Sequence, residues 1–190
     1  MKNIAIFASG KGSNANSIIN YFRHHKNICV KVIITNNAKA DIIHVANEGK
    51  IDCFIFNKAL FISGEKILEC LLKYNISFIA LAGFLLKIPQ KIINKYNGSI
   101  LNIHPAILPG FGGKGMYGLN VHRAVLKAKK KYSGISIHYV NNEYDKGDII
   151  FQAKCNVFQN DTTKLLAKRV QKLEHKFFPI IIENIINNGN

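Results

Sequence analysis

The sequence has no uninterrupted apolar run of the roughly 18 residues that a membrane-spanning helix requires, and its cysteines form no CxxC pair. Each cysteine lies singly in an apolar run, which predicts buried, reduced thiols rather than disulfides or a zinc site. These residues are Cys29, Cys53, Cys70 and Cys155. The N-terminus shows no signal-peptide cleavage pattern. We therefore expect a cytoplasmic protein with no membrane contact, no metal and no secretory leader.

Acidic residues are few: 11 Asp and Glu stand against 26 Lys and Arg, for a formal net charge of +15. A basic excess can indicate a nucleic-acid-binding module, which needs a basic face interleaved with exposed aromatic side chains. Here the lysines are scattered, apart from a cluster at 127–131 that suits a helix C-terminus, and the aromatic residues lie inside apolar runs. The charge follows a chain-wide richness in Lys, Ile and Asn, so we expect no nucleic-acid partner.

The hydrophobic content of 48% is ample for one compact domain over residues 1–190. Apolar segments of strand length alternate with helical patterns, which predicts an α/β fold with a doubly wound, mainly parallel, Rossmann-like sheet. The predicted strands are residues 3–7, 28–35, 52–56, 76–81 and 99–103. The predicted crossover helices are the segment after residue 14 and residues 41–48, 63–74 and 89–96.

The C-terminal part departs from this alternation. A glycine-rich loop at 111–118 and a helix at 121–129 come first, and the extended segments 132–140 and 148–158 follow with a short turn between them. So short a link predicts an antiparallel hairpin, after which a long helix is expected at 161–186. In the parallel part, right-handed crossovers place the strand carboxyl ends on one edge, where such sheets bind ligands.

A glycine-rich turn joins the first predicted strand to the first helix. Its glycines, Gly10 and Gly12, permit close backbone approach, and Ser13 or Asn14 can cap the helix or bind a phosphate. The GKGSN pattern is neither a P-loop nor GxGxxG, so it favours a monophosphate over a nucleotide. A tight βα turn with an ordinary cap would show the same pattern.

The segment LNIHPAILPG, residues 101–110, ends the fifth predicted strand with Asn102 and His104. The apolar segment 85–88 and a turn containing Asp145 are expected at the same edge of the sheet. A carboxylate near His104 would raise the imidazole pKa above about 6.5, and the Asn102 amide can donate to a developing oxyanion. No Ser or Cys stands as an evident nucleophile, which favours direct transfer of an acyl-type group between two bound substrates. Taken singly, each of these residues is more often structural.

Five segments together resemble the phosphoribosylglycinamide formyltransferase family, the folate-dependent enzymes of purine biosynthesis. They are ASGKGSN (8–14), LAGF (81–84), LNIHPAILP (101–109), IHYV with YDKGDII (137–150) and QKLEH (171–175). The NIHP motif with a downstream aspartate is typical of all folate-dependent formyltransferases, and GxGSN narrows the resemblance to this family. The resemblance implies formyl transfer from 10-formyltetrahydrofolate to glycinamide ribonucleotide, which gives the N2-formyl product and tetrahydrofolate without a metal.

The resemblance also implies roles for individual residues. Asn102 would hydrogen-bond the formyl oxygen, His104 would act as general acid, and Asp145 would raise the pKa of His104 and order a water. The ribonucleotide would be bound by Gly12, Ser13, Asn14, Gln171 and Glu174, the last two on one helix face through their i, i+3 spacing. Folate would be bound by Leu85, Leu86, Lys87, Ile88 and Asn102. Residues up to about 100 would then form the ribonucleotide side, and residues 101–190 the catalytic and folate side.

Some positions depart from the family pattern. Many members carry an Arg where Leu86 stands, and often another Arg in the loop before the third crossover helix, here 59–64. The 111–118 loop is longer than in the shortest members. Within the superfamily the alternatives are formyltetrahydrofolate hydrolase and methionyl-tRNA formyltransferase; both usually carry a further domain, for which we expect no room in this chain. We expect a monomer or a homodimer.

Overall fold

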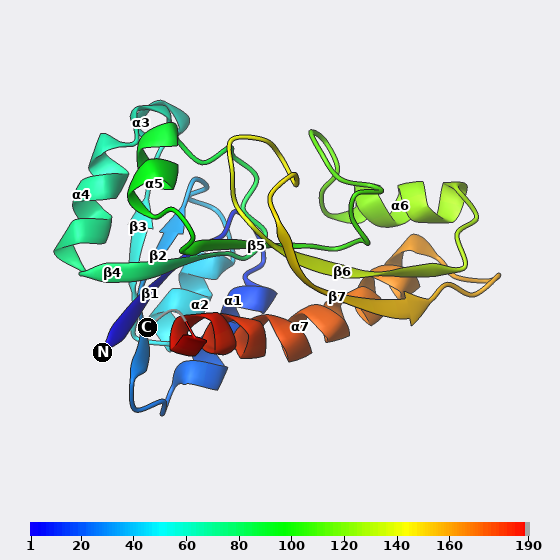
Figure 1. Cartoon of the computed structure of the whole chain (residues 1–190), viewed down its shortest axis with the longest axis horizontal. Coiled ribbons are helices and arrows are strands. Elements are labelled where there is room, and N and C mark those ends of the chain that lie inside the picture. The colour runs from blue at the N-terminus through cyan, green and yellow to red at the C-terminus, as the bar shows by residue number, and fades with distance from the viewer. Residues whose placement is uncertain (189–190) are drawn as a thin grey trace.

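A computed structural model describes residues 1–188, in which seven strands form one sheet with the order β3-β2-β1-β4-β5-β6-β7 (Figure 1). The strands are β1 (Lys2–Phe7), β2 (Ile28–Thr35), β3 (Asp52–Ile55), β4 (Ile76–Leu81), β5 (Ile100–His104), β6 (Tyr132–Tyr139) and β7 (Ile149–Asn156). The helices are α1 (Ser13–Phe22), α2 (Ile42–Glu48), α3 (Lys58–Ser63), α4 (Glu65–Lys73), α5 (Gln90–Lys95), α6 (Leu119–Lys127) and α7 (Thr163–Asn188).

The sheet is parallel from β3 to β5 and antiparallel from β5 to β7. This confirms the predicted doubly wound, mainly parallel sheet with an antiparallel C-terminal hairpin and a long C-terminal helix. The order of the strands reverses between β1 and β4. At such a switch point the crossovers leave in opposite directions, so a crevice opens beyond the strand carboxyl ends.

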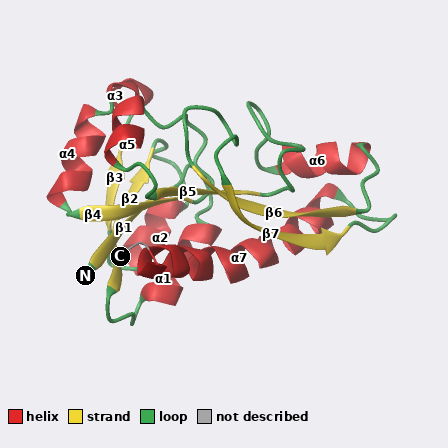
Figure 2. Cartoon of the chain, in the orientation of Figure 1, coloured by secondary structure: helices red, strands yellow, loops and turns green. Residues whose placement is uncertain are grey.

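Helices cover both faces of the parallel part of the sheet (Figure 2). On one face α1, α2 and α7 enclose a core that receives Ile4 and Ile6 of β1. On the other face α3, α4 and α5 enclose a second core that receives Ala5 and Phe7. Because successive side chains of a strand point to opposite faces, β1 supplies both cores, which explains why its last four residues, 4–7, are all apolar.

Several details of the predicted helices are wrong. The segment 63–74 is not one helix opened by Ser63; α3 ends at Ser63, and α4 begins after Gly64, whose φ of +70° breaks the helical path. The helix α3, which the sequence did not reveal, is capped by Asn57, whose side chain accepts a hydrogen bond from the backbone N–H of Leu60. At α1 neither Ser13 nor Asn14 is the cap, because the helix begins at Ser13 and Gly12 precedes it with a φ of +76°.

The long helix α7 begins at Thr163, two residues later than predicted, and carries Pro179 within it. It runs along the sheet and packs against α1. Its last turn lies close to the start of β1, and Lys2 and Asn188 line the same small cavity (Figure 1). Across residues 1–188, no helix has the length and apolar character that crossing a membrane requires. Of the cysteines, Cys70 is buried and the other three are only partly buried, so the prediction of four buried thiols is wrong for those three.

Candidate active site

A cleft of about 900 Å³ lies at the carboxyl edge of the sheet, where the switch point predicts one. It receives side chains from the glycine-rich turn after β1, the segment after β4, the end of β5, the loop before α6 and the face of α7. Among its lining residues are Lys11, Asn14, Leu85, Asn102, His104, Met116, His122, Asp145, Gln171 and Glu174. The turns and loops that the sequence placed at one edge therefore meet in one cavity.

His104, the last residue of β5, is only 3% exposed. Its Nε2 lies 2.8 Å from the carbonyl oxygen of Phe111, which can only accept a hydrogen bond. Nε2 therefore carries a hydrogen, and in the neutral ring Nδ1 holds the free lone pair. Because Nδ1 lies 3.5 Å from Asp145 Oδ2, it is the atom at which His104 can take up or release a proton.

The pKa of His104 lies below its ordinary value. Burial is the main cause, since it penalises the charged ring, and the neighbouring His138 adds to the effect. The Asp145 carboxylate and the Phe111 carbonyl raise this pKa but do not overcome burial. The expectation that the carboxylate lifts the pKa above its ordinary value is thus wrong for the free protein, in which His104 is neutral at neutral pH.

Asp145 lies in a turn with a φ of +56° and gathers several groups around its carboxylate. Its Oδ2 accepts a hydrogen bond of 2.8 Å from the Gly113 N–H, and its Oδ1 lies 3.6 Å from His138 Nε2. Burial would raise the pKa of Asp145, but the facing His138 and His104 rings and the Gly113 N–H hold it below its ordinary value. Asp145 is therefore ionised at neutral pH and can stabilise an imidazolium at His104.

Both amide hydrogens of Asn102 are engaged in the free protein. Asn102 Nδ2 lies 3.0 Å from His138 Nε2 and 3.3 Å from Asp145 Oδ1. The His138 Nδ1–H donates to the Tyr139 carbonyl at 2.7 Å, so its Nε2 is free to accept from Asn102. His138 was not assigned from the sequence. It lies directly opposite Asn102 in the antiparallel β5–β6 register, a pairing that no sequence signal indicated.

At the other end of the cleft, α1 and α7 meet. Gln171 Nε2 donates a 2.9 Å hydrogen bond to Ser13 Oγ, and Asn14, Gln171 and Glu174 all line the cleft. Asn14 Oδ1 is buried without a hydrogen-bond partner. Burial raises the pKa of Glu174, and a hydrogen bond from Asn14 partly offsets this. Gly12 does not line the cleft. It packs closely against α2, since a Cβ at this position would lie 2.6 Å from Ile42 Cδ1.

The segment expected to bind folate divides between cleft and core. Leu85 is 44% exposed and lines the cleft, together with its neighbour Phe84. The side chain of Ile88 is buried in the core under α3–α5, Leu86 packs against the same core, and Lys87 is exposed outside the cleft lining. Only Leu85 of the four brings its side chain to the cavity. Further apolar lining comes from the 111–118 loop and the start of α6, which the sequence had left without a role.

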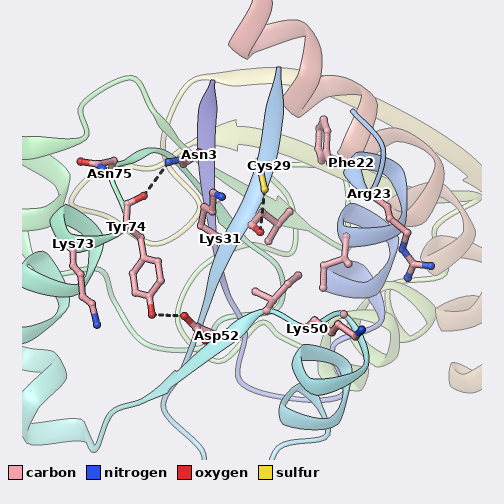
Figure 3. A pocket seen from close by; sticks show the side chains of 14 residues that line it. Asn3, Phe22, Arg23, Cys29, Lys31, Lys50, Asp52, Lys73, Tyr74 and Asn75 are labelled. Carbon is pink, nitrogen blue, oxygen red and sulfur yellow. Dashed lines mark hydrogen bonds between the residues drawn. The ribbon is translucent and has the colours of Figure 1, made fainter. Parts of the chain in front are cut away.

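A second cleft of about 690 Å³ lies at the opposite, amino edge of the sheet (Figure 3). It is lined by Arg23, Lys31, Lys50 and Lys73, with Asp52 as a carboxylate among them. Three of these cations stand at or just beyond the carboxyl ends of α1, α2 and α4. Cations there offset the negative ends of the helix dipoles, so their position has a structural explanation.

Comparison with known proteins gives the class of the chain. The model of the formyl transferase family matches residues 2–182. The chain therefore belongs to the formyl transferase family. Within residues 1–188, no group of three or more His, Cys, Asp or Glu is arranged to hold a metal ion.

Within that family the chain is similar to phosphoribosylglycinamide formyltransferases. It is 33% identical over 197 residues to the enzyme of that name from Bacillus subtilis, covering 100% of this chain and 97% of the relative. It is 40% identical over 187 residues to the chloroplastic enzyme of Arabidopsis thaliana, covering 95% of this chain. The chain spans less than two thirds of the length of the two plant relatives, 64% for Arabidopsis thaliana and 60% for Vigna unguiculata.

Solved structures show the same likeness. The phosphoribosylglycinamide formyltransferase of Bacillus halodurans superposes with a TM-score of 0.89 at 29% identity, covering 100% of this chain and 97% of that one. The enzyme of Anaplasma phagocytophilum superposes with a TM-score of 0.86 at 31% identity, covering 96% of this chain and 87% of that one.

Proposed function

We propose that the protein transfers the formyl group of 10-formyltetrahydrofolate to the amine of glycinamide ribonucleotide, giving the N2-formyl product and tetrahydrofolate in purine biosynthesis. One observation carries the proposal: Asn102, His104 and Asp145 meet in a cleft that also reaches the junction of α1 and α7. His104, a group able to transfer a proton, thus lies between the α1–α7 end of the cleft, which suits an anion, and the apolar side chains that line the rest of the cleft. The likeness to the Bacillus subtilis enzyme over nearly the full length of both chains supports the same activity.

The proposed substrates fit opposite ends of the cleft. The ribonucleotide phosphate would lie at the N-terminus of α1, where backbone N–H groups and the helix dipole favour an anion, near Lys11 and Asn14. Gln171 and Glu174 of α7 would contact the rest of the ribonucleotide. The folate ring system would pack on Leu85 and on the apolar side chains of the 111–118 loop. For Leu86, Lys87 and Ile88 we propose that any contact with folate is made through the backbone.

The chemistry follows from the protonation states in the cleft. The substrate amine attacks the formyl carbon, which gives a tetrahedral intermediate with a negative oxygen and a positive nitrogen. His104 accepts a proton at Nδ1, directly or through a water held by Asp145, and returns it to the folate nitrogen, N10. The C–N10 bond then breaks with its electron pair on N10, and the formylated amine remains.

Asp145 and Asn102 assist in different ways. The Asp145 carboxylate lies 3.5 Å from Nδ1 and stabilises the imidazolium while the proton resides on His104. Asn102 would hydrogen-bond the formyl oxygen after exchanging its longer contact, the one of 3.3 Å to Asp145 Oδ1, for the substrate. Such an oxygen contact matters most in the tetrahedral intermediate, where the charge on that oxygen is greatest.

A spectrophotometric assay with 10-formyl folate and glycinamide ribonucleotide tests the proposal. Formylation of methionyl-tRNA and hydrolysis of the folate in the absence of an acceptor are the controls, because they report the two alternative activities of the superfamily. We expect folate release that depends on glycinamide ribonucleotide. Release without any acceptor, or release only with methionyl-tRNA, would contradict the proposal. A cytoplasmic location and a monomeric or homodimeric state remain predictions for cell fractionation and analytical ultracentrifugation.

A further inference from the structure

His122 of α6 is a buried polar side chain that the proposed mechanism leaves unused. It is 5% exposed and lines the cleft beside His104. Its Nδ1 is buried without a hydrogen-bond partner, and the hydrogen bonds formed among residues 1–188 include none to its ring. The other two buried histidines, His104 and His138, both hydrogen-bond protein groups through the ring. A buried imidazole with no hydrogen bond at either ring nitrogen is costly, and a ligand in the cleft that bonds Nε2, the nitrogen that is not fully buried, would offset part of that cost.

The ring of His122 is a hydrogen-bond donor toward the cleft. Burial, together with the charge of the neighbouring His104, lowers its pKa from the ordinary 6.5 to about 4, so it is neutral at neutral pH. A neutral imidazole has one N–H and one acceptor nitrogen. Orphaned buried N–H groups are rarer than orphaned acceptors, which assigns the hydrogen to Nε2 and the lone pair to the buried Nδ1. Nδ1 is the fully buried ring nitrogen and His122 lines the cleft, so the N–H of Nε2 is the one available to a ligand there.

A donor of this kind would add to the one hydrogen that Asn102 can release to the formyl oxygen. A tetrahedral intermediate develops charge on the formyl oxygen, and preorganised N–H groups stabilise it. In the free protein both hydrogens of Asn102 are already taken by His138 and Asp145. The backbone carbonyl of Phe111 holds the Nε2 hydrogen of His104. His122 therefore offers an uncommitted side-chain N–H in the same cleft as Asn102, His104 and Asp145.

We propose that the Nε2–H of His122 donates a hydrogen bond to the formyl oxygen in the tetrahedral intermediate. This inference rests on the proposed function and adds a catalytic residue to it. The donor is neutral, so it stabilises the negative oxygen without competing with His104 for the proton. Its side chain is also held in place, because His122 lies within α6 and is only 5% exposed.

Three variants separate this role from simple packing. His122→Phe keeps a ring of similar size without the N–H, His122→Gln restores an N–H donor, and Val125→Ala weakens α6 at a buried position outside the cleft lining. For each variant, kcat, the two KM values and the melting temperature are measured. Loss of one oxyanion donor typically costs about 10²- to 10³-fold in kcat, so we expect a loss of about 10²-fold in His122→Phe with little change in KM. We expect His122→Gln to recover much of this loss, and Val125→Ala to lower the melting temperature while kcat stays near that of the wild type.

The outcomes are distinguishable. A His122→Phe variant with kcat near that of the wild type would overturn the inference. The same conclusion follows if His122→Gln is as slow as His122→Phe, or if Val125→Ala loses as much turnover, because packing would then explain the effect. Failure of the proposed function looks different: the wild-type protein itself would show no transfer to glycinamide ribonucleotide, which overturns both proposals.

Discussion

At the scale of single residues, the chemistry open to the site depends on which N–H groups already donate hydrogen bonds within the protein. The Phe111 carbonyl fixes the hydrogen on Nε2 of His104, so proton transfer is confined to Nδ1, which faces Asp145. Asp145 is anchored by the Gly113 N–H, so the glycine-rich loop and the turn that carries Asp145 are tied together. Replacing any of these groups should therefore disturb proton transfer more than the binding of either substrate.

Asp145→Asn tests this at constant size. The neutral amide cannot stabilise an imidazolium, so we expect kcat to fall by about 10²-fold or more, toward the range typical for loss of proton-transfer catalysis, while both KM values stay similar. His104→Ala should lose at least as much. The pKa of His104, followed by NMR titration, should be lower in Asp145→Asn than in the wild type. In the wild type the Asp145 carboxylate raises this pKa and so offsets part of the effect of burial. Turnover near that of the wild type in either variant would refute the catalytic assignment.

His122 predicts a pH dependence of stability. Its pKa is about 4 in the folded protein and 6.5 ordinarily, so between these values the unfolded chain binds more protons. The contribution of His122 to the free energy of unfolding is therefore fully present above pH 6.5 and is lost as the pH drops toward 4. The loss amounts to at most roughly 3 kcal/mol, since one pKa unit corresponds to about 1.4 kcal/mol. In His122→Gln the melting temperature should fall less between pH 7 and pH 4.5 than in the wild type. Equal slopes in the two proteins would contradict the assignment of this pKa.

At the scale of elements, local sequence signals were informative for the strands and less so for the ends of the helices. The strands β2 and β4 have the predicted bounds, and β5 delivers Asn102 and His104 to the carboxyl edge as expected. The helix α3 was missed because its six residues are too few to show a helical period. His138 could not be assigned, because its role depends on the β5–β6 register, a long-range pairing with no sequence signature. Likewise, only tertiary packing decides that Leu85 faces the cleft while Ile88 faces the core.

The break between α3 and α4 gives a prediction about stability. Gly64 has a φ of +70°, and a Cβ there would approach Pro89 Cβ to 3.0 Å. Gly98 has a nearly identical φ of +72° with nothing within 4 Å of its Cβ position, so it is a matched control. Both Ala variants should be destabilised by about 1 kcal/mol or more by the left-handed backbone, and Gly64→Ala should lose more because of the contact.

Urea unfolding of the two variants measures that difference. Neither glycine lines the cleft at the carboxyl edge, so kcat should stay at the wild-type level in both. Equal stabilities would show that Pro89 moves aside without cost, and the contact would then play no part in holding the break between α3 and α4.

At the scale of the whole molecule, the two ends of the chain build one site. The helix α7 returns to α1 and places Gln171 against Ser13, so the C-terminal part also reaches the expected ribonucleotide end. The division into a ribonucleotide side up to about residue 100 and a catalytic and folate side beyond it remains a prediction. What the sheet shows is that β1, β4 and β5 converge on a common edge, so neither part forms the cleft alone.

The net charge of +15 gains a specific meaning from the position of its lysines. Lys164 and Lys168 of α7 both line the cleft, four residues apart on the helix face that also carries Gln171. They would attract a phosphate-bearing substrate, and salt would screen that attraction. In the double variant Lys164→Gln with Lys168→Gln, we expect KM for glycinamide ribonucleotide to rise roughly fivefold, as exposed charge pairs contribute up to about 1 kcal/mol. The kcat value should not change, because neither lysine is close to the proton-transfer groups in the proposed binding mode.

A control variant at Lys31 and Lys50 distinguishes the local effect of the α7 lysines on KM from the effect of the net charge of the molecule. It lines the cleft at the amino edge of the sheet (Figure 3), so Lys31→Gln with Lys50→Gln removes the same charge far from the site. We expect that control to leave KM unchanged and to keep the wild-type dependence of KM on salt, whereas the α7 variant should show a weaker dependence. If both double variants raise KM equally, the attraction comes from the net charge, and the lysines of α7 have no special part in binding the phosphate.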